Sequence, residues 1–313
     1  MQQSGDQHEF WPPTDSGPQR QLVGYGTNPP IIQWPDGARL AVSICLNVEE
    51  GSERSHAFGD GMNEPNPEYD KAFPGHIRDL ATESLFEYGS RVGVHRLLDL
   101  FIDLDIRCTA FACAVALAVN PDVGRRLVDD GHEICSHGLR WTELWTLSRE
   151  EERQHIRDAV KLFEQVTGAR PTGWYSRYGP SINTRELLVE EGFEYDSDAY
   201  NDDLPYYVDV GARKHLVVPY SMMYNDGQFG GRVGGAEEFL RYLIRGFDYL
   251  WAESARVPRI MSIGLHPRLI GQAARTSVLR EFLEHALGRG EVWFARREEI
   301  ARVFRAQHPP ESL

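Results

Sequence analysis

The chain has 313 residues, 41% of them hydrophobic, which suffices for one large α/β domain or for two smaller ones. Its formal net charge of -14 opposes contact with phosphate backbones, so we expect no nucleic-acid partner. The N-terminal residues lack the pattern of a signal peptide, and no apolar run approaches the roughly 18 residues needed to span a bilayer, so we expect a cytoplasmic protein without a membrane partner.

The chain begins with a polar segment. Residues 1–36 are rich in Pro, Gly and Gln, and we expect an N-terminal arm that packs on a single domain spanning residues 37–313. Residues 39–46 are almost continuously apolar, which is typical of a strand buried on both faces. The segment 54–88 contains several Gly and Pro residues and shows no helical period. We therefore predict a long loop there, and such loops are usually functional or disordered.

Beyond residue 90, apolar runs alternate with helical patterns. Ser148 and Glu151 form a capping-box signature, and Gly168 marks the end of the helix that follows. Helices are predicted at residues 91–103, 149–167, 183–191, 236–252, 277–287 and 297–305, with a short one from residue 121. Further strands are predicted at residues 108–114, 133–136, 173–176, 195–199, 215–219, 259–265 and 291–295.

This alternation predicts the fold class. About seven strand–helix alternations favour an α/β fold, a distorted (β/α) barrel of about seven parallel strands with helical crossovers. A doubly wound open sheet is the alternative. No G-x-G-x-x-G follows the first strand, so the dinucleotide-binding form of that sheet is disfavoured.

The four cysteines indicate a reducing compartment. All of them lie in apolar runs and none belongs to a C-x-x-C pair, so we predict buried free thiols. They are Cys45, Cys108, Cys113 and Cys135.

Polar side chains follow the predicted strands at the points where the strands end. In a barrel of parallel strands the carboxyl ends share one face, and that face carries the chemistry. The sequence has no G-x-S-x-G, P-loop or H-E-x-x-H motif, so serine-hydrolase, nucleotide and zincin sites are disfavoured. The residues at the strand ends are Glu49, Glu50, His137, Tyr175, Arg177, Asp198 and His266.

The two glutamates are candidates for a general base. Glu49 and Glu50 are adjacent, so on a strand end they point to opposite sides and one of them faces the barrel mouth. A bulge would bring both in, and their repulsion would then raise one pKa and suit that group to act as a base near neutral pH. A solvated acidic loop is the alternative.

The remaining polar residues each have a structural alternative. His137 could be a hydrogen-bonded core histidine, but His266 occupies an equivalent strand end, which favours a functional pair. Arg177 could hold a carbonyl or a carboxylate by paired donors, or form a surface salt bridge. The acidic run 196–203 lacks the Gly and the distal Glu of an EF-hand loop, so we expect Asp198 to orient an arginine or a histidine.

The order of these motifs resembles the polysaccharide deacetylase (NodB-homology) superfamily. The matching features are the acidic pair, S-H-G-x-x-[aromatic], R-P-x-G-W-Y, Y-D-S-D and L-H. The resemblance implies a distorted barrel that hydrolyses amides, usually N-acetyl groups of sugars, with a divalent metal. The family's metal set is an Asp of a D-D pair and two His of an H-x-x-x-H motif. Here Glu49-Glu50 stands for the acidic pair, and Trp141 stands in place of the second histidine.

Other strings more closely resemble the metal-independent bacterial allantoinase branch of that superfamily. The resemblance implies a cytoplasmic homo-oligomer that opens a cyclic ureide without a cofactor. It covers most of residues 30–300, but the loops after Glu53 and around Arg177 depart from it. The strings are E-E-G-S-E at 49–53, E-Y-G-S-R at 87–91, S-H-G-L-R-W at 136–141, G-W-Y at 173–175, Y-D-S-D at 195–198, D-D-L-P-Y at 202–206 and L-H-P-R-L-I-G at 265–271.

We therefore expect a hydrolase of a non-peptide C–N bond in a small cyclic amide. Glu49 or Glu50 would activate water, His137 would polarise the carbonyl together with Arg177, and His266 would protonate the leaving nitrogen. Trp141 would pack on a flat heterocycle. The other residues expected to line the substrate pocket are Tyr175, Asp198 and Arg268.

Two alternatives remain at this point. In a metal-dependent sugar deacetylase, one divalent metal such as zinc would be held by Glu50, His137 and a third ligand, either His266 or Asp198. In a non-catalytic protein of the same fold, the pocket would only bind a ligand.

Overall fold

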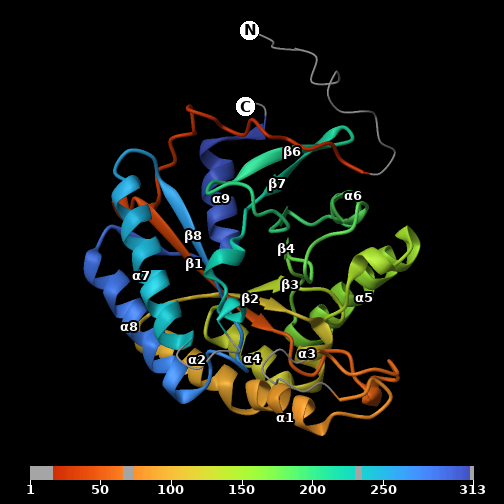
Figure 1. Cartoon of the computed structure of the whole chain (residues 1–313). Coiled ribbons are helices and arrows are strands. Elements are labelled where there is room, and N and C mark those ends of the chain that lie inside the picture. Colours follow the sequence, from red (N-terminus) through yellow and green to blue (C-terminus); the bar gives the residue numbers. More distant parts are fainter. Residues whose placement is uncertain (1–16, 66–72, 230–234, 311–313) are drawn as a thin grey trace.

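The structure is a computed structural model, and it describes residues 17–65, 73–229 and 235–310 (Figure 1). One curled sheet occupies the centre of the molecule, and helices cover its outer face. The strands are β1 (Leu40–Val48), β2 (Thr109–Ala112), β3 (Glu133–Ser136), β4 (Gly173–Trp174), β5 (Tyr195–Asp196), β6 (Tyr206–Val210), β7 (Arg213–Val217), β8 (Arg259–Leu265) and β9 (Val292–Phe294). The α-helices are α1 (Leu80–Tyr88), α2 (Val94–Asp103), α3 (Ala114–Val119), α4 (Pro121–Asp129), α5 (Arg149–Thr167), α6 (Thr184–Glu190), α7 (Gly235–Glu253), α8 (Ala273–Arg289) and α9 (Arg297–Gln307).

The strand order confirms the predicted distorted barrel. Hydrogen bonds run through the sheet in the order β6-β7-β5-β4-β3-β2-β1-β8, and β9 pairs with β1 outside this path. The seven strands from β7 to β8 are parallel to one another, as predicted, whereas β6 is antiparallel to β7. Because β6 and β8 stand at the two ends of the path, the barrel is curled but not closed.

The burial of both faces of strand β1 explains why its sequence is apolar throughout. Every residue of this strand is buried. Leu40, Val42 and Ile44 join the large cluster packed against the outer helices, while Ala41 and Cys45 join a second cluster inside the barrel. Both faces of the strand therefore exclude water, as expected for a central parallel strand.

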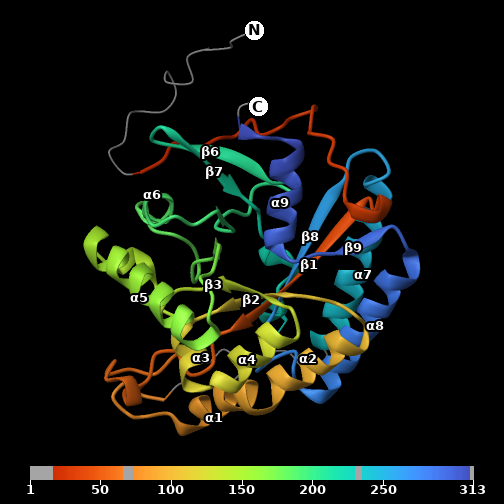
Figure 2. The same cartoon turned by 180° about the vertical axis from the view of Figure 1, so that it is seen from behind.

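A side chain from the first turn of α9 occupies the inside of the barrel. Figures 1 and 2 show α9 beside β1 and β8, on the side opposite α7 and α8. Arg297, at the first turn of α9, is fully buried. Its guanidinium donates to the hydroxyls of Ser197 and Ser262 and to the carbonyl oxygen of Pro219, at 2.8, 2.9 and 2.6 Å. These bonds satisfy a buried charge with polar acceptors from the ends of β5 and β7 and from the middle of β8.

Three local predictions are wrong, and one of them concerns α3 (Ala114–Val119), where no helix was expected. Residues 80–88 form helix α1 where a loop was expected. Asp79 caps α1 by accepting bonds from the backbone N–H groups of Ala81 and Thr82, but only Thr82 and Phe86 of the helix are buried. So few buried positions produce no apolar period in the sequence. Strand β6 was also missed, because an edge strand of partly buried residues lacks a continuous apolar run.

Between α1 and α2 the helix widens into a π-helical turn, η4 (Gly89–Gly93). Such turns often mark functional sites. Here the turn lies against the segment that follows β8, since a β-carbon added at Gly93 would be 2.1 Å from the carbonyl oxygen of Pro267.

The described part of the predicted N-terminal arm, residues 17–36, packs on the rest of the chain, and it contains no α-helix or strand, only the start of a 3₁₀ turn at Pro35–Gly37. Ile32 and Trp34 are buried, and the hydroxyl of Tyr25 donates to the carbonyl oxygen of Pro205 at 2.5 Å. The remainder of the predicted arm, residues 1–16, lies outside the described residues.

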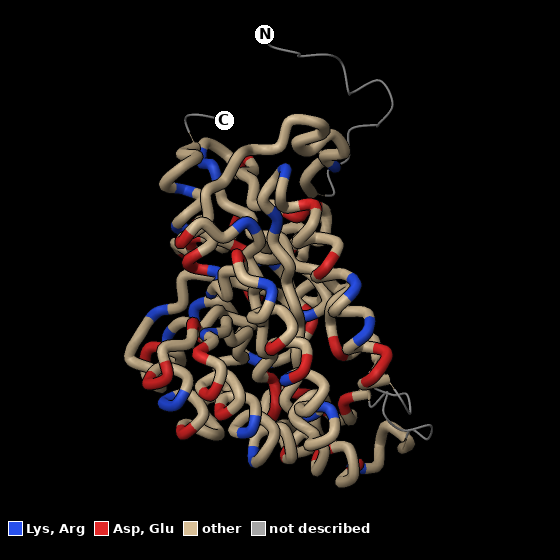
Figure 3. The backbone as a smooth tube through the Cα atoms, turned by 90° about the vertical axis from the view of Figure 1, so that its left-hand side faces the viewer, with Lys and Arg blue, Asp and Glu red and all other residues tan. Residues whose placement is uncertain are grey.

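Three composition-based observations can be followed in the structure. All four cysteines are free and buried, which confirms that prediction. None of the helices in the described ranges is long and apolar enough to cross a membrane. Acidic and basic positions are interleaved along the chain in the view of Figure 3, although the net charge is strongly negative.

Candidate active site

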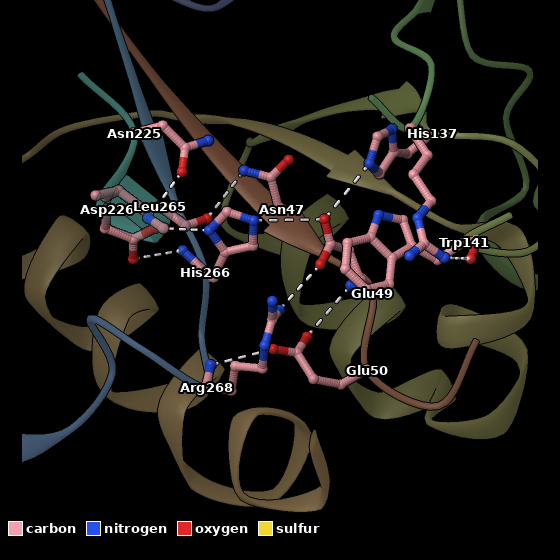
Figure 4. Close-up of polar contacts among 12 residues, drawn as sticks. Asn47, Glu49, Glu50, His137, Trp141, Asn225, Asp226, Leu265, His266 and Arg268 are labelled. Carbon is pink, nitrogen blue, oxygen red and sulfur yellow. Dashed lines mark hydrogen bonds and ion pairs between the residues drawn. The ribbon is translucent and has the colours of Figure 1, made fainter. Parts of the chain in front are cut away.

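Three strands end beside one another in a buried group of ionisable side chains (Figure 4). Glu49 follows β1, His137 follows β3 and His266 follows β8. Strand β1 pairs in parallel with β8 and β2, and β2 pairs in parallel with β3, so these ends lie at one edge of the sheet. Each of the three residues is less than 9% exposed. The structure therefore brings together three of the four residues predicted to act as acids or bases.

The carboxylate of Glu49 is the centre of this group. Its Oε1 lies 3.5 Å from His137 Nε2 and 3.5 Å from His266 Nε2, and its Oε2 lies 3.0 Å from a guanidinium nitrogen of Arg268. Burial raises the pKa of Glu49, but the charge of His266, hydrogen bonds from both imidazoles and the charge of Arg268 together hold this pKa well below its usual range. Glu49 is therefore ionised at neutral pH.

His266 is held between two carboxylates. Its Nδ1 lies 2.6 Å from Oδ1 of Asp226, and its backbone N–H donates to Oδ2 of Asp226 at 2.9 Å. Burial lowers the pKa of His266, but the charges of Glu49 and Asp226 and the hydrogen bonds to them outweigh this effect and raise it to about 10. His266 is therefore an imidazolium at neutral pH, with Nε2–H directed at Glu49.

Asp226 was not predicted from the sequence. It lies in a short 3₁₀ turn, and Asn225 caps that turn by accepting a bond from the N–H of Gly227 at 2.8 Å. The string Asn-Asp-Gly does signal a turn in the sequence. Nothing local indicates that the aspartate meets a histidine forty residues later, because that contact depends on how the loop after β7 crosses the end of β8.

His137 is fixed by the backbone and ring of Tyr175. Its Nδ1 lies 2.6 Å from the carbonyl oxygen of Tyr175, so Nδ1 carries the hydrogen and Nε2 faces Glu49. The two rings are stacked, with centroids 5.1 Å apart and an interplanar angle of 5°. The hydroxyl of Tyr175 points elsewhere, at 3.2 Å from that of Tyr200. Tyr175 thus positions the imidazole.

Glu50 faces away from the histidines, as strand alternation predicts. Its carboxylate accepts the backbone N–H of Arg268 at 3.1 Å and the backbone N–H of Glu49 at 3.2 Å. Burial raises the pKa of Glu50 to about 7, with Arg268 opposing the shift and the charge of Glu49 adding to it. Geometrically, Glu50 ties the end of β1 to the segment after β8, whereas Glu49 faces the imidazoles.

Arg177 and Trp141 form a second group beside the first. The guanidinium of Arg177 pairs with both carboxylate oxygens of Glu64 and donates to the carbonyl oxygen of Trp141. Its central carbon lies 3.8 Å from the centre of the Trp141 ring. Arg177 was predicted to hold a substrate carbonyl. In this structure its guanidinium instead binds Glu64 and holds the loop that carries this residue.

Asp198 has a different partner from the one expected. Its carboxylate accepts the N–H and the hydroxyl of Ser176, both at 2.7 Å, in place of the arginine or histidine predicted from the sequence. The physical reason is its place at the end of β5, directly beside the segment that follows β4. Burial, together with the charge of Asp196, raises the pKa of Asp198.

The donor set does not fit the divalent metal that the resemblance implies. The predicted set is not assembled, because Glu50 binds backbone N–H groups and Asp198 binds Ser176. The described residues contain no group of three His, Cys, Asp or Glu side chains arranged to hold an ion. Glu49 lies near His137 and His266, but its second oxygen already pairs with Arg268, a cation.

Comparisons with known proteins agree with this fold. The family model described as polysaccharide deacetylase matches residues 82–195. A Schizosaccharomyces pombe protein named "Putative polysaccharide deacetylase" is 35% identical over 306 residues, which cover 90% of this chain and 94% of that relative. A solved structure named as a probable polysaccharide deacetylase from Pseudomonas aeruginosa PAO1 is 46% identical, with a TM-score of 0.88, and the match covers 93% of this chain and 99% of that one. The solved structure of Puue allantoinase is 45% identical, with a TM-score of 0.88 and coverages of 93% and 98%.

Proposed function

We propose that this chain, which belongs to the polysaccharide deacetylase family of hydrolases for non-peptide carbon–nitrogen bonds, opens the ring of a cyclic ureide such as allantoin. The observation that carries the proposal is the carboxylate of Glu49 set between two imidazoles and a guanidinium. Such a group supplies a base, an acid and fixed charge without a bound ion. The likeness to a solved allantoinase supports the choice of a cyclic ureide.

The reaction is the addition of water to a ring carbonyl carbon. Glu49 accepts a proton from water as the oxygen bonds to that carbon, and His137, whose Nε2 lies 3.5 Å from the same carboxylate, helps to fix the direction of attack. The ring carbon–nitrogen bond then breaks, and His266 gives its Nε2 proton to the leaving nitrogen. The product carries a carboxyl group and an N–H where the ring had an amide.

An aromatic wall borders this group. Trp141 is 7% exposed, and its ring centroid lies 6.1 Å from that of Phe86. The Arg268 guanidinium lies between the wall and Glu49, 5.4 Å from the indole centre. A planar ureide ring can pack on an indole face.

One observation favours a second candidate. Glu49 and two histidines are the residue types of some catalytic zinc sites, although the described residues do not arrange them around an ion, and both Nδ1 atoms are held by acceptors, as is usual for zinc-bound imidazoles. The alternative function is therefore a metal-dependent deacetylase of an N-acetyl sugar, as the names of several relatives suggest. The contact of Arg268 with Glu49 is the reason we prefer the metal-independent function.

Two expectations from the resemblance remain proposals, namely a cytoplasmic location and a homo-oligomeric assembly. The protein would then act on a small cyclic amide without a nucleic-acid or membrane partner. Size-exclusion chromatography with light scattering tests the assembly directly, and a monomeric mass would reject it.

A substrate comparison tests the proposed function. Purified protein is given allantoin, hydantoin, succinimide and an N-acetylglucosamine oligomer side by side at equal concentration, and the release of acid or amine is followed. We expect allantoin to have the highest kcat/KM and the sugar oligomer to be inert. Deacetylation of the oligomer together with inert cyclic amides would reject the proposal in favour of the alternative.

A further inference from the structure

Arg268 places a permanent positive charge against the proposed base. A guanidinium nitrogen lies 3.0 Å from Oε2 of Glu49, and the whole residue is only 9% exposed. The central guanidinium carbon lies 4.6 Å from the ring centre of Phe86 and 5.4 Å from that of Trp141. Because water is nearly excluded and both aromatic faces are electron-rich, this charge is weakly screened and felt strongly nearby.

The backbone of Arg268 is held in place by a hydrogen bond and by close packing against the turn η4. Its N–H donates to Glu50 at 3.1 Å. A β-carbon at Gly89 would lie 2.8 Å from the backbone nitrogen of Arg268, and one at Gly93 would lie 2.1 Å from the carbonyl oxygen of Pro267. The π-helical turn η4 therefore touches the segment after β8 through two positions that only glycine can occupy. Such close packing fixes where the guanidinium lies relative to Glu49.

Attack on an amide carbonyl puts negative charge on its oxygen, and that charge needs a cation. His266 cannot serve throughout the reaction, because it gives its proton to the leaving nitrogen. Arginine keeps its proton at every pH at which proteins are folded. We propose that the Arg268 guanidinium is the permanent cation of the reacting centre, stabilising the oxyanion electrostatically as a bound metal ion would. This inference rests on the proposed function and extends it.

Substitution of Arg268 tests its role in the reaction. For R268A we expect kcat/KM to fall by about 10²–10³-fold, as for loss of an oxyanion-stabilising group, and added guanidinium chloride at millimolar concentration to restore part of it where equal sodium chloride does not. R268K should lose about tenfold or more, since a compact ammonium lacks the planar fork. The matched control is R280A, which removes a half-exposed surface arginine paired with Asp103 and should leave kcat/KM unchanged. R268K or R268A with wild-type kcat/KM would overturn the inference.

A pH profile separates this role from one of positioning. If Arg268 only kept Glu49 ionised, its loss would raise the pKa of Glu49, and activity would return at higher pH. We expect the deficit of R268A to persist at every pH up to about 9, because the missing charge acts on the oxyanion. Recovery of the variant to the wild-type rate at high pH would show that Arg268 merely tunes the base. Thermal unfolding of each variant identifies any loss of fold.

Zinc titration tests the same inference without a substrate. Removing a cation that lies 3.0 Å from Glu49 should raise the affinity of the Glu49–His137–His266 group for Zn²⁺ by about tenfold or more in R268A, measured by calorimetry with zinc chloride alone. Equal zinc affinity in wild type and variant would mean that the charge of Arg268 is not felt at the centre. Failure of the proposed function is recognised separately, since wild-type protein would then be inert towards allantoin whatever the zinc titration gives.

Discussion

Glu49 and Glu50 are neighbours in sequence with opposite surroundings. Glu49 faces two imidazoles and a guanidinium, and its pKa is lowered, whereas Glu50 accepts two backbone N–H groups, and its pKa is raised to about 7. Sequence alone predicts that one of the two faces the barrel mouth but not which one. Their contacts support the proposal that Glu49 acts on water, while Glu50 holds the segment after β8.

Separate substitutions test this division. Glu49→Gln removes the acceptor for the proton of water, so kcat/KM should fall by about 10²–10⁴-fold. Glu50→Gln keeps one acceptor for a backbone N–H, so it should lower the melting temperature and cost less than about tenfold in kcat/KM. Steady-state kinetics with thermal unfolding measures both effects, and an equal loss of activity in the two variants would refute the assignment.

The raised pKa of His266 predicts how the rate falls on the alkaline side of the pH–rate profile. Activity should decrease as the pH rises through about 10, because His266 then loses the proton that it gives to the leaving nitrogen. Asp226 raises that pKa, so Asp226→Asn should move the decrease to lower pH. The measurement is kcat/KM from about pH 6 to about pH 11 for both proteins. A decrease that stays in place in the variant would mean that another group titrates.

At the scale of elements, the π-helical turn η4 connects stability to activity. A methyl group at Gly93 would displace Pro267 and with it Arg268, so Gly93→Ala should destabilise the fold by about 1–3 kcal/mol and reduce kcat/KM as well. Gly288→Ala is the matched control. Gly288 belongs to the last turn of α8, and a β-carbon added there would have nothing within 4 Å, so this change should stabilise the protein by about 0.5–1 kcal/mol without changing kcat/KM. Full activity in the Gly93 variant would show that the close packing of η4 has no role in positioning Arg268.

Elements with strong local patterns could be predicted from the sequence. Strands β3 and β8 and helix α5 match their predicted bounds, because continuous apolar runs and the Ser148 capping box are local signals. Helix α1 and strand β6 could not be found, because each buries too little of its surface to create a pattern. Hydrophobic periodicity therefore does not reveal elements whose formation depends on a few tertiary contacts.

The candidate site shows the same limit at the level of side chains. The positions of Glu49, His137 and His266 follow from strand ends, and strand ends are local. The partners of Arg177 and Asp198 are Glu64 and Ser176, and they come from loops whose courses no short stretch of sequence determines. Asp226 was missed for the same reason.

For the whole molecule, the curled sheet places Glu49, His137 and His266 at one edge. The parallel path from β7 to β8 brings strand ends that are far apart in the sequence to that edge. Inside the barrel, the buried guanidinium of Arg297 in α9 is hydrogen-bonded to protein atoms. This division leaves the carboxyl ends for chemistry and the interior for stability, as in other barrels. The membership of the chain in the polysaccharide deacetylase family fixes the bond type, and the charges around Glu49 support the proposed reaction without an ion.

The central claim is that hydrolysis proceeds with internal charges alone. The decisive measurement is the turnover of allantoin by protein dialysed against a strong chelator, with residual metal quantified by elemental analysis in the same sample. We expect kcat/KM to be unchanged when the metal content is far below one equivalent, and unchanged again when zinc is added. Activity that falls in proportion to metal content and returns with one equivalent of zinc would contradict the account.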